Sequence, residues 1–294
     1  YGQLKCTDYP QEWYEVKERL SQDEEDFNVL FLPWHLYMDY SWLPNRDKRL
    51  GNPAWQFFDK PAIAGDSIEV PGLSSESNVN PISRYVGFLL GQGNDIDNLG
   101  ELLAPLNVKY IILVHEVDYT SYDFLYRQAD LAVELEKEGI TLFRNEHPTA
   151  RVYGVSSLVY IQSWEEYLEL SQEQDVMEHL YLFGEGESDS QQRPIEKLDF
   201  VKRSPVRYQV DGGASDYVIF TVPQKASTRG WEYDGQPAMK NLGFMPTFPA
   251  KGGGGEVAYR RFHLVYLPCY AVSALALAVW VWYCLCPFPG LRPR

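Results

Sequence analysis

LVYLPCYAVSALALAVWVWYCLC, residues 264–286, is an uncharged apolar stretch of 23 residues in a chain that carries 41 acidic and 26 basic residues. About 20 apolar residues in a helix are enough to cross the hydrocarbon core of a bilayer. Arg260 and Arg261 precede the stretch, and its Tyr and Trp residues lie toward its two ends, where interfacial aromatics gather. A buried helix of a soluble core is the alternative, but core helices of this length rarely lack every charge. The stretch therefore predicts a transmembrane helix over residues 263–287.

The remainder of the chain is strongly acidic. Residues 260–294 contain four Arg and no acidic residue, so residues 1–259 hold 22 basic and 41 acidic residues, a net charge of −19. This charge argues against a surface that binds nucleic acid, because phosphate backbones require clustered Lys and Arg. We expect the acidity to serve solubility.

The residues that usually hold metals or cofactors follow no recognisable pattern. Three of the four Cys lie in the apolar stretch, which leaves Cys6 alone and excludes a CxxC metal pair or a disulfide framework before it. The five His show no HxH, HxxxH or HExxH spacing. Gly91-Gln-Gly93 has the wrong spacing for a dinucleotide-binding loop. We therefore predict neither a metal site nor a cofactor.

Hydrophobic periodicity predicts helices mixed with strands over the first 185 residues. In residues 7–21, Trp13, Val16 and Leu20 fall on one face of a helix. The dense Val, Ile and Leu content of residues 107–117 predicts a strand. The other predicted elements are a strand over 26–34, helices over 81–90, 94–106 and 163–183, a hairpin over 131–146 and a strand over 150–161. This mixture predicts an α+β domain over residues 1–185.

Residues 184–194 form a polar, Gly- and Ser-rich segment, which predicts a linker. The composition of the sequence changes after it. Short alternating stretches separated by Gly and Pro follow, and they are typical of a small β-sandwich over residues 186–262. Asp234-Gly235 is the strongest hairpin-turn signal. Trp231 is expected to anchor the core of this domain, with stacking on a sugar as its less favoured role. The predicted fold class is an α+β domain followed by a small all-β sandwich-like domain and one C-terminal transmembrane helix.

The segment PWHLYMDYSWLPNRDKRLGNPAWQFFDKP, residues 33–61, mixes aromatic rings with acidic and basic side chains. Sugar sites need this mixture, since ring faces stack on a pyranose while carboxylates and guanidinium groups bind hydroxyls or phosphates. Asp39 and Asp47 are a candidate acid/base pair, and the basic side chains are candidates for contact with lipid phosphate. The alternative is a long loop held by its own aromatics and Asp–Arg pairs. The candidate ligand-binding residues are Trp34, Asp39, Trp42, Arg46, Asp47, Arg49 and, in the later domain, Trp231.

The order of several motifs resembles the C-terminal part of the YfhO-like membrane proteins, which are related to the GT-C glycosyltransferases. In that family a GVKY strand precedes a YEN…PRAY stretch, and here residues 107–110 are NVKY and residues 144–153 are RNEHPTARVY. A later PGW…DG…NG stretch precedes a YRP strand and the last span in the family. Its counterparts here are Arg229-Gly230-Trp231, Asp234-Gly235, Asn241-Leu242-Gly243 and Tyr259-Arg260-Arg261. The resemblance covers most of residues 100–286.

The resemblance implies an extracytoplasmic domain at the end of a polytopic enzyme that moves sugar from a lipid-linked donor to a cell-envelope polymer. GT-C proteins usually place their acidic catalytic residue in an early loop after the first span. That loop has no counterpart here, so no catalytic residue is transferred to this chain. We expect the chain to position a glycan or a lipid-linked sugar beside an upstream membrane domain, and not to catalyse transfer by itself.

Two other functions stay open on the sequence alone. One is a non-enzymatic, single-span surface protein with a carbohydrate-binding or adhesive β-sandwich. The other is a hydrolase with its site in residues 33–61. In each case the lipid bilayer is an expected partner and the bulk of the chain is expected outside the cell membrane. The positive-inside rule places the short Arg-bearing tail, residues 288–294, in the cytoplasm.

Overall fold

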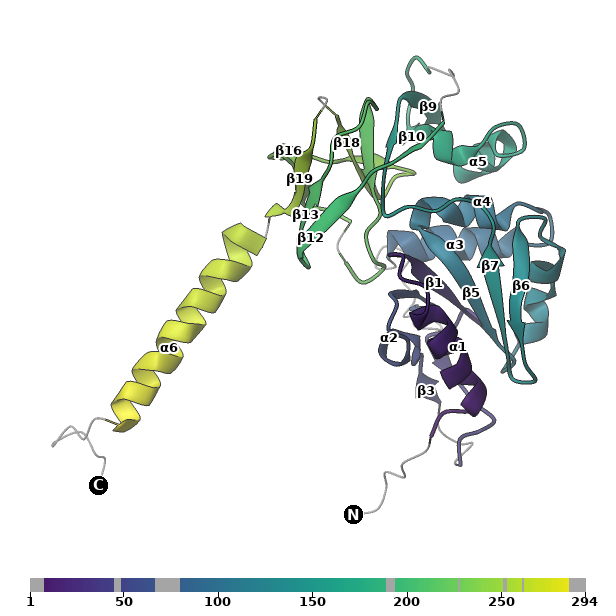
Figure 1. Cartoon of the computed structure of the whole chain (residues 1–294), viewed down its shortest axis with the longest axis horizontal. Coiled ribbons are helices and arrows are strands. Elements are labelled where there is room, and N and C mark those ends of the chain that lie inside the picture. The colour runs from purple at the N-terminus through teal and green to yellow at the C-terminus, as the bar shows by residue number, and fades with distance from the viewer. Residues whose placement is uncertain are drawn as a thin grey trace.

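The computed structural model of the protein has a mixed α/β part, a β-rich part and a single long helix that projects away from both (Figure 1). The colour gradient in Figure 1 follows this order along the chain, so each part is formed largely by consecutive elements. The described residues are 8–44, 49–66, 80–188, 194–226, 228–250, 253–260 and 262–285.

A five-stranded mixed sheet forms the centre of the first part, with the strand order β4-β1-β5-β7-β6. β4, β1 and β5 run parallel, and the β6–β7 hairpin completes the sheet by pairing β7 antiparallel to β5. The register places Leu30 beside Ile111 and Ile112 beside Leu142. The strands are β1 (Asn28–Leu32), β4 (Ala62–Ile63), β5 (Val108–Val114), β6 (Leu131–Glu136) and β7 (Ile140–Asn145).

Helices cover both faces of this sheet because its central strands are apolar on both sides. α1 (Gln11–Ser21) lies on the face that carries Val29, and the three side chains predicted to point inward from it are buried there. α3 (Pro81–Gly91) and α4 (Leu99–Leu103) cover the opposite face, which carries Leu30. The mixture of helices and strands predicted for this part is confirmed, although α4 is shorter than predicted.

The helix predicted over residues 163–183 is only half present. α5 (Trp164–Leu170) begins where predicted, because the Ser163 side chain accepts the backbone N–H of Glu166. The second half instead forms the strand β10 (His179–Phe183), which pairs in parallel with β9 (Ser157–Ile161). The prediction was wrong here because the apolar residues of β10 find a strand partner that helical periodicity does not reveal.

Two further five-stranded sheets pack face to face in the β-rich part. One has the order β11-β8-β14-β18-β17 and the other the order β12-β13-β19-β15-β16. Their inner faces share a core, in which the ring centroids of Phe220 and Trp231 lie 4.9 Å apart. Asp234 and Gly235 turn the chain between β15 and β16 with φ angles of 47° and 79°, as a type I′ hairpin turn requires. The sandwich-like prediction is confirmed in part, since β8 comes from residues before position 185.

The strands of the first of these sheets are β8 (Val152–Val155), β11 (Glu196–Lys197), β14 (Tyr217–Phe220), β17 (Met239–Asn241) and β18 (Met245–Pro249). Those of the second are β12 (Phe200–Ser204), β13 (Arg207–Val210), β15 (Trp231–Tyr233), β16 (Gln236–Pro237) and β19 (Gly255–Tyr259). The shorter elements between β1 and β4 are β2 (Tyr37–Met38), β3 (Leu50–Gly51) and α2 (Ala54–Phe57).

The terminal helix stands apart from the rest of the chain (Figure 1). Among the described residues, Leu264–Leu285 is the one segment long and apolar enough to cross a membrane; its mean hydropathy is 2.0 and none of it is buried against the protein. It consists of a π-helical turn, η5 (Phe262–Tyr266), followed by α6 (Leu267–Leu285). A core helix of a soluble domain would be mostly buried, so that alternative is wrong. An apolar surface of this size needs a non-aqueous surrounding.

Candidate functional site

The carboxyl ends of β1 and β5 lie where the strand order of the mixed sheet reverses. The chain leaves β1 for β4 on one side and then returns to β5 on the other side. Ligands of open α/β sheets bind outside the carboxyl ends of the strands at such a point. The segment after β1 begins at Pro33, and the segment after β5 begins at His115. This edge of the sheet is therefore the first candidate site.

Polar contacts join the two segments at this edge. The imidazole Nε2 of His35 lies 3.0 Å from Asp118 Oδ1. Ser41 donates from its backbone N–H and its hydroxyl to the carboxylate of Glu116, at 3.0 and 2.8 Å. Val117 has a φ of 55°, which is strained for a β-branched residue. Strained backbone of this kind clusters at functional sites, where the surrounding contacts hold it in place.

A cavity of 330 Å³, the edge cavity, lies beside these contacts. One wall is the indole of Trp42, whose ring packs against the rings of Tyr9 and Tyr40 at centroid distances of 5.2 and 5.3 Å. The edge cavity is thus lined by aromatic side chains as well as by polar groups. Its principal lining residues are Glu12, Trp13, Ser41, Trp42, His115, Glu116 and Glu138.

The polar groups of the edge cavity are mainly acceptors. Glu12 Oε2 accepts the backbone N–H of Gly139 at 3.1 Å. His115 Nδ1 lies 2.7 Å from the carbonyl oxygen of Glu138, to which it donates, and His115 Nε2 lies 3.0 Å from Thr141 Oγ1. Carboxylate oxygens keep further lone pairs for the O–H or N–H donors of a ligand. An indole side chain beside such acceptors is the combination that suits a sugar ring.

The structure brings only some of the sequence-predicted residues together. Trp42 lines the edge cavity, whereas Trp34 is half-buried and packs against the core on the α3 side of the sheet. Asp39 and Arg49 form a long, exposed ion pair of 3.9 Å, which contributes little stability. The proposed acid/base pair of Asp39 and Asp47 stays a prediction, because Asp47 lies outside the described part of the chain. Arg46 also lies outside it.

Sequence reasoning missed the partners that complete the edge cavity. His115 and Glu116 follow β5 directly, and Glu138 lies in the β6–β7 turn. The predicted strand over residues 107–117 includes both of them, whereas β5 ends at Val114 and leaves them at the edge of the sheet where ligands bind. No local signal connects Glu12 to Gly139, because the two residues are 127 positions apart.

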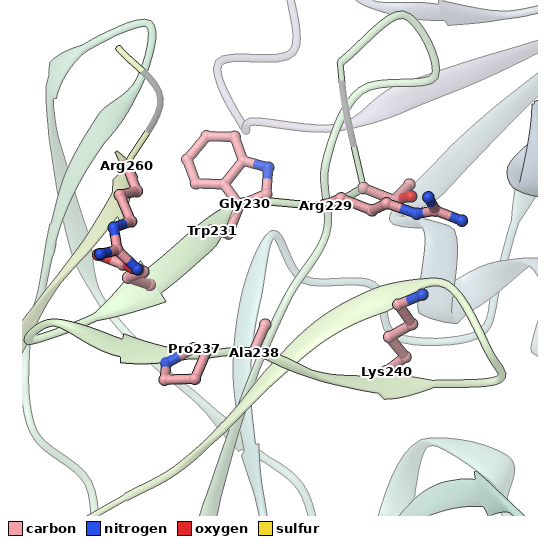
Figure 2. Close-up of a pocket in the computed structure, with 9 residues that line it drawn as sticks. Arg229, Gly230, Trp231, Pro237, Ala238, Lys240 and Arg260 are labelled. Atoms are coloured by element: carbon pink, nitrogen blue, oxygen red, sulfur yellow. The ribbon is translucent and has the colours of Figure 1, made fainter. Parts of the chain in front are cut away.

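A second cavity, of 240 Å³, lies beside Trp231 and is named the Trp231 cavity (Figure 2). Trp231 is only 4% exposed, and its ring packs against Tyr259 at 5.5 Å as well as against Phe220. It therefore anchors the core of the β-rich part while its indole borders the cavity. Pro237 and Ala238 border the cavity where the chain passes from β16 in one sheet to β17 in the other.

Basic side chains surround the Trp231 cavity. In the view of Figure 2, Arg260 lies on one side of the indole, and Arg229 and Lys240 lie on the other. The guanidinium of Arg260 pairs with Glu232 at 3.2 Å, and its backbone N–H donates to the carbonyl oxygen of Gly230 at 2.9 Å. Within the described part of the chain, Lys240 has no ion pair. The cavity therefore carries an excess of positive charge.

A partly buried polar cluster lies outside both cavities and ties α4 to the turn before β10. Glu101 accepts the backbone N–H of Val176 at 2.9 Å, and His147 Nε2 lies 3.3 Å from Asp175 Oδ1. Burial raises the pKa of Glu101 and of Asp130. Burial opposes protonation of His147, but Asp175 and the other nearby carboxylates outweigh it and raise the pKa of that imidazole. Nowhere in the described residues are three or more His, Cys, Asp or Glu side chains grouped to hold a metal ion.

Comparison with known proteins gives a distant structural likeness and no sequence match. No family model matches the chain, and no curated protein matches it. The cryo-EM structure of the arabinofuranosyltransferase AftD from Mycobacteria is similar at 9% identity and a TM-score of 0.45, over 86% of this chain and 30% of that one. Two structures of a point mutant of that enzyme give TM-scores of 0.40. The chain thus spans less than a third of the enzyme's length, and these TM-scores are too low to assign a family or an activity.

Proposed function

We propose that this chain is the envelope-facing, membrane-anchored part of a GT-C-like membrane glycosyltransferase, and that it holds a glycan or the sugar of a lipid-linked donor. The edge cavity carries the proposal, because it combines an indole face with carboxylate acceptors at the carboxyl ends of two parallel strands. In this role the chain positions a sugar, and the catalytic residues of the transferase belong to a separate membrane domain. The YfhO-like order of motifs supports the same assignment.

The terminal helix supports the membrane location of this role. Its 22 residues rise about 33 Å as a helix, which matches the roughly 30 Å hydrocarbon core of a bilayer. The net charge of −19 on residues 1–259 keeps that part in water beside the membrane. A glycan held there would lie close to the surface at which lipid-linked sugars are presented.

Glycan binding by the full chain in non-ionic detergent tests the proposal. An array of cell-envelope glycans identifies a ligand, and isothermal titration then compares the Trp42→Ala and Glu116→Gln variants with the wild type. We expect each variant to bind about ten-fold more weakly, since losing one stacking face or one charged acceptor corresponds to about 1.4 kcal/mol. Trp42→Phe keeps a ring and should retain most of the affinity.

Trp55→Ala is the matched control for this experiment. Trp55 is also a partly buried Trp of the 33–61 segment, but it does not line the edge cavity, and its Nε1 donates to Gln224 at 3.3 Å. This variant should bind glycan like the wild type. Unchanged binding in both edge-cavity variants, or equal weakening in the control, would refute the glycan site. Circular dichroism in the same detergent checks that each variant is folded.

A non-enzymatic surface protein with a carbohydrate-binding domain is the second candidate. The observation that favours it is the single candidate span among the described residues. The gene sequence upstream of the codon for Tyr1 separates the two functions. A series of apolar spans, with acidic residues after the first, supports the transferase, and a signal peptide directly before Tyr1 supports the surface protein.

A further inference from the structure

We propose that the Trp231 cavity binds the phosphate group of a lipid in the adjoining membrane leaflet. This inference goes beyond the holding of a glycan, because it concerns a different cavity and a different ligand chemistry. It rests on three observations: the place of the cavity next to the terminal helix, the sign of its charge, and the rigid wall that Trp231 provides.

The cavity lies at the level of the lipid headgroups. The hydrogen bond from the Arg260 N–H to the Gly230 carbonyl joins the cavity to the end of β19, from which the chain enters the terminal helix. The candidate span begins at Leu264, only four residues after Arg260. Four residues span at most about 14 Å in any conformation, and each headgroup layer is about 5–8 Å thick. The cavity border therefore lies within reach of the layer that contains lipid phosphates.

The cavity is positively charged in a chain that is acidic as a whole. Residues 1–259 carry a net charge of −19. Among the residues that the structure describes, the cavity is lined by three basic side chains and by Glu232 as the one acidic side chain; the basic ones are Arg229, Lys240 and Arg260. An Arg fork binds a phosphate through two parallel hydrogen bonds, and Lys adds a compact charge. An anion is thus attracted to this cavity.

The core of the β-rich part holds the cavity in shape. Trp231 is buried between the sheets, and its backbone pairs with that of Tyr259 in β19. Pro237, on another wall, has a fixed φ and adds rigidity. Figure 2 shows the indole in the centre of the site with the basic side chains at its sides. The apolar wall suits the glycerol or first chain carbons of a lipid, and the cations suit its phosphate.

Native mass spectrometry of the full chain in non-ionic detergent tests the site with phosphatidic acid and a polyprenyl monophosphate as probes. The double variant Arg229→Ala/Lys240→Ala should bind both lipids about 25-fold more weakly, since each basic side chain near a headgroup contributes roughly five-fold. The exchange Arg229→Lys/Lys240→Arg keeps the charge and should retain binding. Glu232→Gln should strengthen binding, because it releases Arg260 from its ion pair. A damaged fold would not produce this gain.

The matched control removes the same charge elsewhere. Lys17→Ala/Arg84→Ala changes one basic residue on α1 and one on α3, far along the chain from the terminal helix, and should leave lipid binding unchanged. Oleate, an anionic lipid without phosphate, should bind weakly to every variant. Equal retention of oleate and phosphatidic acid would overturn the proposal, as would a loss of about two-fold or less in the Arg229/Lys240 variant.

The two lipid probes also separate the sources of the phosphate. Tighter binding of phosphatidic acid assigns the site to a bulk membrane lipid, and tighter binding of the polyprenyl phosphate assigns it to a lipid sugar carrier; either result supports the site. Glycan binding at the edge cavity should be unchanged in all of these variants. A failure of the glycan experiment therefore leaves the lipid experiment interpretable, and the reverse also holds.

Discussion

Replacing Arg151 by Met should destabilise the protein by about 3 kcal/mol, because this buried guanidinium joins the mixed sheet to the β-rich part. Its side chain is only 4% exposed. Nε and Nη2 donate to Asp26 Oδ1 at 3.0 and 2.5 Å, and Nη2 also donates to Asn28 Oδ1 at 3.0 Å. Nη1 donates to the carbonyl oxygen of Thr221 at 3.1 Å. Asn28 opens β1 and Thr221 follows β14, so one side chain holds two sheets together.

The magnitude follows from the acceptors that would lose their donor. Asn28 and Thr221 are fully buried, and an unsatisfied buried acceptor costs about 1–3 kcal/mol. The side chain of Asp26 is 40% exposed, so its carboxylate regains water and adds less. Met has a similar length, which keeps the cavity cost small. About 3 kcal/mol is a large share of the roughly 5–15 kcal/mol that stabilises a typical domain.

Urea unfolding of the full chain in detergent micelles, followed by Trp fluorescence, measures this change in the free energy of unfolding. Arg144→Met is the matched control, because Arg144 is 45% exposed and pairs with Glu134 and Glu146 at 3.3 and 3.2 Å. Such surface pairs contribute less than about 1 kcal/mol. A loss for Arg151→Met no larger than that of the control would refute the reasoning that this guanidinium joins the two parts.

Three further predictions concern the core, the buried cluster and the terminal helix. Trp231→Ala should lower the free energy of unfolding by about 3–5 kcal/mol, measured by urea titration, because it leaves a cavity between the sheets. His147→Gln should destabilise the protein at about pH 6 and much less at about pH 9. The folded-state pKa of His147 is raised beside Asp175, so its contribution is full below the unfolded-state pKa and is lost as pH rises through the folded-state pKa; equal losses at both pH values would contradict this. Leu277→Arg, within α6, should weaken membrane insertion by roughly 2.5–3.5 kcal/mol, and alkaline extraction of membranes that leaves this variant as firmly retained as the wild type would argue against a spanning helix.

The elements that the sequence predicts well are those whose burial pattern is local. The inward face of α1 and the apolar strands β1 and β5 follow from spacings of two to four residues, which either a helix or a strand satisfies within its own length. The strand β10 does not follow from local spacing. His179–Phe183 is apolar enough for either a helix or a strand, and only its pairing with β9 decides between the two. Periodicity carries no information about such a distant partner.

The candidate sites divide in the same way. Trp42 and Trp231 are conspicuous in the sequence because each is a large aromatic residue in a polar, loop-like segment, and the structure places each at a cavity. The contact between Glu116 and Ser41 depends on the topology, since only the reversal of strand order between β1 and β5 brings the two residues together. The strand order of the sheet, and not the sequence of the Trp42 segment, therefore decides which residues this segment contacts.

By itself, the sequence determined that the terminal stretch is long and apolar enough to cross a membrane and that the rest of the chain carries the acidic excess, because transfer free energies and charges add residue by residue. Only the tertiary structure decided which side chains meet. Arg151 reaches Asp26 across 125 positions, and Arg229, Lys240 and Arg260 come to one cavity from separate segments of the chain. Such contacts depend on strand order and sheet packing, which are cooperative outcomes of the whole fold and are not encoded in any local window.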